Sequence, residues 1–211
     1  MNILTTYRLG KSFQLLLVTG FLYAGQVDAQ SINFSTWTGS DEITITSVQA
    51  MPKLDFNLKQ SIITKNSAPV QINLSDMQAV GFRIEAPEGF DLTVEVDAPQ
   101  VLRLDGTGSD PDETVPFQIG IAYSNQLSID EASAKGSAIQ LPAGFYNVTF
   151  PMDRRTAGAP GPPPTPISGD YVRPKATAWF FIYGTLGPIG PVVAGAYSEN
   201  ITVNVYFTSN D

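Results

Sequence analysis

The sequence predicts an all-β protein made of short antiparallel strands. Its clearest segment is the C-terminal stretch at residues 195–207. Large apolar residues share one parity there (Tyr197, Ile201, Val203, Val205 and Phe207), and polar residues share the other (Ser198, Asn200, Thr202 and Asn204). A period of two is typical of a strand with one buried face and one wet face. Similar segments recur at short spacing and are separated by Gly, Pro, Asn and Asp, with no long helical pattern between them. These observations favour an antiparallel β-sandwich.

The first 29 residues have the features of a secretory signal peptide. Arg8 and Lys11 give a basic start, residues 13–25 are mostly apolar, and small residues end at Ala29. A membrane anchor is the alternative, but a spanning helix needs about 20 apolar residues and this segment is shorter and interrupted. We therefore expect residues 1–29 to be removed and the mature chain to begin at Gln30. The expected location is secreted, in the periplasm or at a bacterial cell surface, with no membrane insertion after cleavage.

The composition excludes several classes of partner and chemistry. The chain has 12 Lys and Arg against 20 Asp and Glu, a net charge of −8. Without residues 1–29 the balance is 10 against 19, or −9. An acidic protein lacks the basic surface that nucleic acid or anionic lipid requires. The chain has no His and no Cys, so it cannot build a Ser-His-Asp triad, a Cys-His pair, the usual zinc site or a disulfide. We expect no cofactor.

Residues 30–42 form a polar N-terminal extension that carries three large apolar residues, Ile32, Phe34 and Trp37. Ile32 and Phe34 share one parity, so they could enter neighbouring pockets if the segment lay as a strand. One interpretation is a frayed terminus or an ordinary first strand of the same domain. The functional interpretation is a strand that the chain donates to a neighbouring subunit.

Residues 43–211 are expected to form one β-sandwich domain, since roughly 180 mature residues suffice for one. The clearest hairpin lies at residues 80–96, where two alternating segments flank a turn with Pro87 and Gly89. Residues 127–136 could form one short helical turn, with Ser128 and Glu131 at capping-box spacing. The remaining strands are expected at residues 43–46, 54–56, 70–74, 101–104, 115–123, 146–150 and 179–183.

Two loops carry alternative interpretations. Asp105, Asp110, Asp112 and Glu113 could surround a calcium ion, but the loop at 105–113 lacks the EF-hand order, and we favour a solvated turn without metal. The Pro/Gly-rich loop at 156–170 is either a recognition arm or a tolerated surface insertion.

The run 179–183, Trp-Phe-Phe-Ile-Tyr, does not alternate, so it must hide both of its faces. It lies either in the middle of the sandwich or partly under another chain. For this reason Trp179 and Phe181 join Ile32, Phe34 and Trp37 as candidate subunit-interface residues.

Four segments together resemble a known protein family. They are Leu54-Asp-Phe56, Val80-Gly-Phe-Arg-Ile-Glu-Ala-Pro-Glu-Gly89, Phe181-Ile-Tyr-Gly184 and Ala194-Gly-Ala-Tyr-Ser-Glu-Asn-Ile-Thr-Val-Asn-Val-Tyr206. Together they resemble a bacterial secreted β-sandwich family of unknown function that is similar to spore coat protein U and the chaperone–usher pilins. The resemblance implies an immunoglobulin-like, pilin-like sandwich whose open groove accepts a neighbour's N-terminal strand.

The function that this resemblance implies is a structural, non-enzymatic subunit of a bacterial surface fibre or coat, assembled by β-strand complementation. Its expected partners are copies of itself or related surface subunits, with an export chaperone as a further possibility. The alternative is a monomeric surface module that binds carbohydrate or protein through its loops. A carboxylate-pair hydrolase is the remaining option, although nothing in the sequence identifies an acid–base pair.

Overall fold

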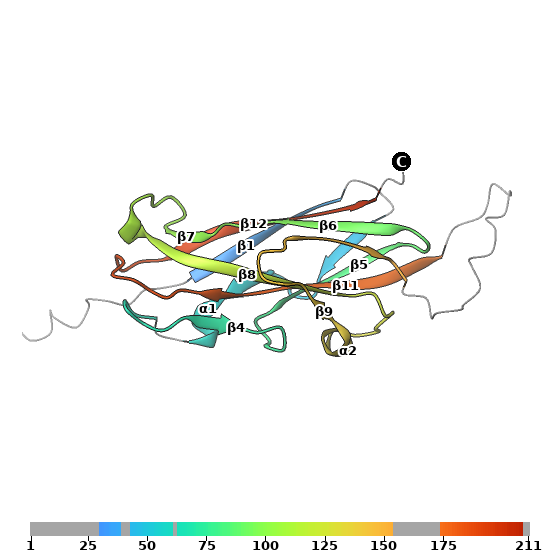
Figure 1. Ribbon diagram of the computed structural model, residues 1–211, viewed down its shortest axis with the longest axis horizontal. Helices are drawn as coiled ribbons and strands as arrows, with labels where there is room; N and C mark the ends of the chain where they lie inside the picture. The colour runs from blue at the N-terminus through green and yellow to red at the C-terminus, as the bar shows by residue number, and fades with distance from the viewer. Residues whose placement is uncertain (1–29, 39–42, 61–62, 154–173, 209–211) are drawn as a thin grey trace, which may run out of the picture.

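A computed structural model describes residues 30–38, 43–60, 63–153 and 174–208, with the backbone alone for residues 30–38. The predicted signal peptide and the Pro/Gly-rich loop at 156–170 lie outside the described residues. The described chain is mostly antiparallel β-structure, as the sequence predicts, and its strands form two layers (Figure 1).

The first layer contains the C-terminal strand at its centre. Its strands, in spatial order, are β10 (Asn147–Pro151), β6 (Asp91–Asp97), β12 (Tyr197–Phe207), β1 (Gln30–Thr38) and β3 (Lys53–Asp55). A further strand, β7 (Val101–Leu104), pairs with the beginning of β12. The β1–β12 pair is parallel, and the other pairs of the described chain are antiparallel.

The second layer is built around the aromatic strand. Its strands are β2 (Thr44–Ser47), β5 (Val80–Pro87), β11 (Lys175–Leu186), β8 (Thr114–Ser124) and β9 (Ile139–Gln140), and β4 (Val70–Ile72) continues the β5 side of β11. Strand β8 links the layers, because its first residues pair with β7 and the rest with β11. Three short helical segments complete the fold, namely α1 (Phe56–Lys59), η1 (Pro111–Glu113) and α2 (Glu131–Ser137).

One apolar core lies between the two layers. The inward residues of β11, Phe180 and Ile182, are fully buried with those of β12, Ile201 and Val205. Each side chain of this kind that leaves water contributes roughly 1.5–3 kcal/mol. The alternation in the sequence therefore corresponds to real inward and outward faces.

The predicted hairpin at residues 80–96 is wrong in its pairing, although both strands and the turn exist. Gly89 adopts a φ of 83° at the turn, as a glycine there allows. However, β5 pairs with β11 and β2, while β6 pairs with β10 and β12. The turn therefore crosses from one layer to the other. Alternation sets which face of a strand is buried, and it does not set which strand lies beside it.

Helix α2 confirms the short helix predicted at residues 127–136, but its N-cap is Asp130 rather than Ser128. The Asp130 Oδ1 atom accepts a hydrogen bond from the Ser133 backbone N–H at 2.8 Å. This bond lowers the pKa of Asp130 below its ordinary value. A charged cap of this kind satisfies one of the free N–H groups at a helix start.

The ionisation of Tyr197 makes the free energy of unfolding depend on pH in the alkaline range. Its buried hydroxyl donates to the Val193 carbonyl oxygen at 2.6 Å and lies 3.3 Å from that of Asp112. Burial, together with the charges of Asp112, Glu113 and Asp105, raises its pKa above 10.0. Well below pH 10.0 Tyr197 is neutral in both states, and as the pH rises through 10.0 the unfolded tyrosine loses its proton before the folded one does.

We therefore expect the free energy of unfolding to fall as the pH rises above 10.0. Tyr197→Phe should cost about 0.5–1.5 kcal/mol at neutral pH, because it removes the hydroxyl hydrogen bond. It should also show a shallower alkaline decline than the natural chain. Urea unfolding across this pH range measures both effects, and parallel declines of the two proteins would rule out Tyr197 as their source.

Candidate functional site

The first candidate site is the slot that β1 fills between β12 and β3. Nine residues of β1 lie in parallel register with β12, from Gln30 beside Tyr197 to Thr38 beside Val205. On its other edge β1 pairs with β3, where Ile32 lies opposite Leu54. Within the described residues, β1 is the strand that pairs with β3. Without β1, one edge of β12 and both edges of β3 would have no hydrogen-bonded partner strand among the described residues.

Two of the predicted interface residues, Ile32 and Phe34, pair in the register with buried residues of the neighbouring strands. Ile32 lies opposite Leu54, and Phe34 lies beside Ile201, and both of these neighbours are 0% exposed. Trp37 lies beside Asn204, which is half-buried. The shared parity of Ile32 and Phe34 thus corresponds to two same-parity positions in the register, at the level of Leu54 and Ile201.

The other two predicted interface residues lie elsewhere and need correction. Trp179 is 5% exposed and Phe181 is 0% exposed, and both pack in a small second core with Leu74 and Ala134. The Trp179 indole Nε1 donates to the Ser128 carbonyl oxygen at 2.9 Å. Their cover comes from α2 and from the loop of residues 73–79 of this same chain. Trp179 and Phe181 therefore belong to the interior of this chain and have almost no surface left for a partner subunit.

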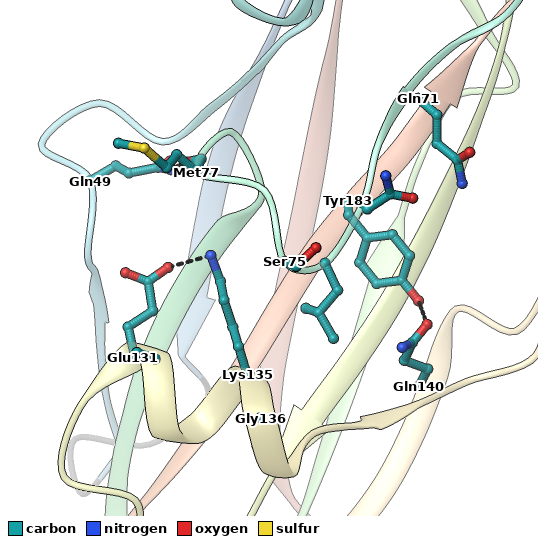
Figure 2. A pocket seen from close by; sticks show the side chains of 12 residues that line it. Gln49, Gln71, Ser75, Met77, Glu131, Lys135, Gly136, Gln140 and Tyr183 are labelled. Carbon is teal, nitrogen blue, oxygen red and sulfur yellow. Dashed lines mark hydrogen bonds and ion pairs between the residues drawn. The ribbon is translucent and has the colours of Figure 1, made fainter.

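The second candidate site is a pocket of about 740 Å³ on the outer side of the second layer (Figure 2). Its walls come from α2 and from the 73–79 loop, and Tyr183 lies with Gln140 at one end. We call it the α2 pocket. The residues that line it are Gln49, Gln71, Asn73, Leu74, Ser75, Met77, Glu131, Ala132, Lys135, Gly136, Gln140 and Tyr183.

Tyr183 lies flat on the sheet because its cross-strand neighbour is Gly120. A β-carbon at position 120 would stand 2.5 Å from Tyr183 Cε2 and 2.8 Å from Cζ. The phenol hydroxyl donates to Gln140 Oε1 at 3.1 Å, which holds the ring in place. Burial raises the pKa of Tyr183, so this hydroxyl remains a donor at neutral pH.

The charged groups of the α2 pocket are paired with one another. Lys135 Nζ lies 2.8 Å from Glu131 Oε1, donates to the Asp76 carbonyl oxygen at 3.2 Å and lies over the Phe181 ring. The Asp76 carboxylate accepts hydrogen bonds from Lys59 Nζ and from the Asn73 backbone N–H, and these lower its pKa. The pocket wall therefore offers neutral amide and hydroxyl groups rather than an unpaired charge.

The acidic loop at 105–113 forms a turn that ends in η1. Glu113 Oε2 accepts a hydrogen bond from the Ser109 backbone N–H at 3.2 Å, and the Glu113 N–H donates to the Asp110 carbonyl at 2.9 Å. In the part of the chain that the structure describes, no three acidic, His or Cys side chains gather as metal ligands would.

No protein-family model matches this chain, and a search of the curated proteins found no match either. Among the described helices, none combines the length and the apolar character needed to cross a membrane. The functional conclusions below therefore depend on the geometry of the β1 slot and the α2 pocket.

Sequence reasoning did not find the α2 pocket. Its lining comes from four separate segments, around residues 49, 71–77, 131–140 and 183, and many of these residues are ordinary surface polar types. The available signal was Gly120, a glycine within an otherwise alternating strand, which often marks a close approach of another group.

Gly120→Ala should displace the Tyr183 ring, because the new methyl group would occupy its position. We expect a loss of about 1–3 kcal/mol in the free energy of unfolding, typical of overpacking, and a change in the NMR shifts of the Tyr183 ring. Gly136→Ala is the matched control, since a β-carbon there meets nothing within 4 Å. Because position 136 lies inside α2, Gly136→Ala should raise the free energy of unfolding by up to about 1 kcal/mol. Equal stability of the two variants would contradict the packing of Tyr183 on Gly120.

Proposed function

We propose that this protein is a structural, non-enzymatic, pilin-like subunit of a bacterial cell-surface fibre or coat, assembled by β-strand complementation. The observation that carries the proposal is the β1 slot, in which an N-terminal strand covers the edge of β12 along nine residues. The described ladder contacts of the slot would be the same if a second copy supplied β1. A second copy can present the same strand in the same register.

The energetics of the slot favour exchange between copies. An uncovered strand edge presents a row of free N–H and C=O groups and invites pairing with another chain. Exchange of an identical element replaces every contact of the closed chain by the same contact between chains, so it costs little. Strand addition of this kind combines main-chain hydrogen bonds with pockets for alternate side chains, which Ile32 and Phe34 would fill.

Two further features support a secreted, structural role. Residues 1–29 have the pattern of an export signal, and export of an open-edged subunit would require a chaperone or its own β1 to cover the slot. The described lining of the α2 pocket holds one carboxylate, Glu131, and it is paired with Lys135. Acid–base hydrolysis of a glycoside requires two carboxylates in separate roles.

A disulfide between β1 and β12 tests whether the β1 strand in the slot comes from the same chain or from a second copy. Asn33 and Asn200 are partners in the parallel register, and adjacent strands lie roughly 4.8 Å apart, within disulfide reach. The chain has no cysteine of its own, so Asn33→Cys with Asn200→Cys gives two thiols. After oxidation of the purified mature protein, we expect a ladder of covalent multimers on a non-reducing gel.

The control pairs Asn33→Cys with Thr177→Cys, a position in the second layer that does not pair with β1. It should give no ladder. A version that begins at Asp41 should lose the assemblies seen by light scattering in the mature protein. Intramolecular disulfides in single chains would show that each copy keeps its own β1, and the assembly proposal would then fail.

A monomeric surface module that binds carbohydrate or protein is the second candidate function. The α2 pocket is the observation that favours it, because a polar pocket with an aromatic floor suits a small ligand. Ligand binding would become the proposed main function if the disulfide experiment gave single chains with intramolecular disulfides.

A further inference from the structure

The α2 pocket has the size and the preformed walls of a small-ligand site. Its volume of about 740 Å³ falls within the usual range for such sites. Gln49 Nε2 fixes the 73–79 loop by donating to the carbonyl oxygens of Met77 and Ala79. On the opposite wall, Asp130 caps α2, and Lys135 joins α2 to the loop through the Asp76 carbonyl. A site held from both sides needs little ordering when a ligand enters.

The floor of the pocket is an aromatic ring set flat on the sheet. Gly120 lies under Tyr183, and the hydrogen bond to Gln140 holds the ring from its edge. The ring is part of the pocket lining and lies beside Gln140 at one end of it (Figure 2). An aromatic face carries partial negative charge and attracts the weakly positive C–H groups of a saturated ring.

The walls offer hydrogen bonds of the type that a polyhydroxylated ligand needs. The side chains of Gln71, Asn73 and Ser75 are exposed on the loop side, and Gln140 is exposed beside Tyr183. A carboxamide both donates and accepts, as does a hydroxyl group, so each can pair with a sugar hydroxyl in either direction.

The charges of the pocket select against an ionic ligand. Glu131 and Lys135 already pair at 2.8 Å, and Lys135 has the Asp76 carbonyl as a second partner. Because the two charges neutralise each other, an anion or a cation gains little net attraction from the pair, and a neutral molecule loses nothing. From these features we propose that the α2 pocket binds a neutral sugar, of one or two residues, with its ring stacked on Tyr183.

This site is independent of the β1 slot, and the inference goes beyond the proposed structural role. The α2 pocket opens on the outer side of the second layer, whereas β1 lies in the first layer between β12 and β3. Sugar binding and strand exchange can therefore each fail without the other.

The test is an NMR titration of the isotope-labelled mature protein. The probes are methyl glycosides of glucose, galactose, mannose and N-acetylglucosamine, together with the disaccharides cellobiose, lactose and chitobiose. We expect at least one of them to cause saturable shifts at Tyr183 and Gln140 at millimolar concentration. The charged counterparts, glucuronic acid and glucosamine, should bind several-fold more weakly, because each must desolvate a charge without gaining an unpaired opposite charge in the pocket.

Three variants connect the signal to the pocket. Tyr183→Ala should weaken binding by about tenfold or more, because it removes the floor. Gln71→Ala should weaken it several-fold, and because Gln71 is exposed, this variant keeps the fold if Tyr183→Ala does not. Thr177→Ala is the control on the same strand, β11, outside the pocket lining, and should bind as the natural chain does. The proposal is overturned if no neutral sugar of the panel gives saturable shifts, if the charged sugars bind equally well, or if Gln71→Ala leaves the affinity unchanged.

Discussion

The structure depends on keeping both edges of β12 paired. This strand places Ile201, Val203 and Val205 in the core with 0–1% exposure, so its backbone groups have little access to water and need partners in the sheet. One edge is covered by β6 and β7, which are separated by a short break, and the other by β1. Because β3 also pairs with β1, the N-terminal strand connects the C-terminal strand to the start of the domain. A segment that precedes the domain in sequence is thus needed to complete its first layer.

Strand β11 has the corresponding place in the second layer, and its composition explains why a pocket exists there. Phe180 and Ile182 face the core between the layers, while Trp179 and Phe181 face outward and cannot be left in water. Helix α2 and the 73–79 loop cover these two outward residues. Their cover ends before Tyr183, which has a polar hydroxyl and tolerates partial exposure. The pocket is therefore the place where an apolar surface gives way to a polar one.

The sequence predicted strands well where one face is wet. The strand predicted within residues 195–207 is observed at Tyr197–Phe207, and the all-β class is confirmed. The run 179–183 is expected to hide both faces, and residues 179–182 do so, but the outer cover comes from α2 and the 73–79 loop of the same chain. Pairing was harder to predict, as the turn at Gly89 illustrates, because a two-layer fold places consecutive strands in different sheets. The α2 pocket could not be predicted, since Tyr183 and Gly120 become neighbours only when the register of β8 and β11 is known.

The position of Trp179 has a practical consequence for following motions of this molecule. The chain has two tryptophans, and Trp37 belongs to β1 while Trp179 is buried under α2 with its indole N–H bonded to Ser128. A Trp37→Phe chain would thus keep a single tryptophan, in the small outer core rather than between the layers. Its emission would report local opening of the α2 cover separately from unfolding of the sandwich. The two processes could then be assigned separate free energies within one domain.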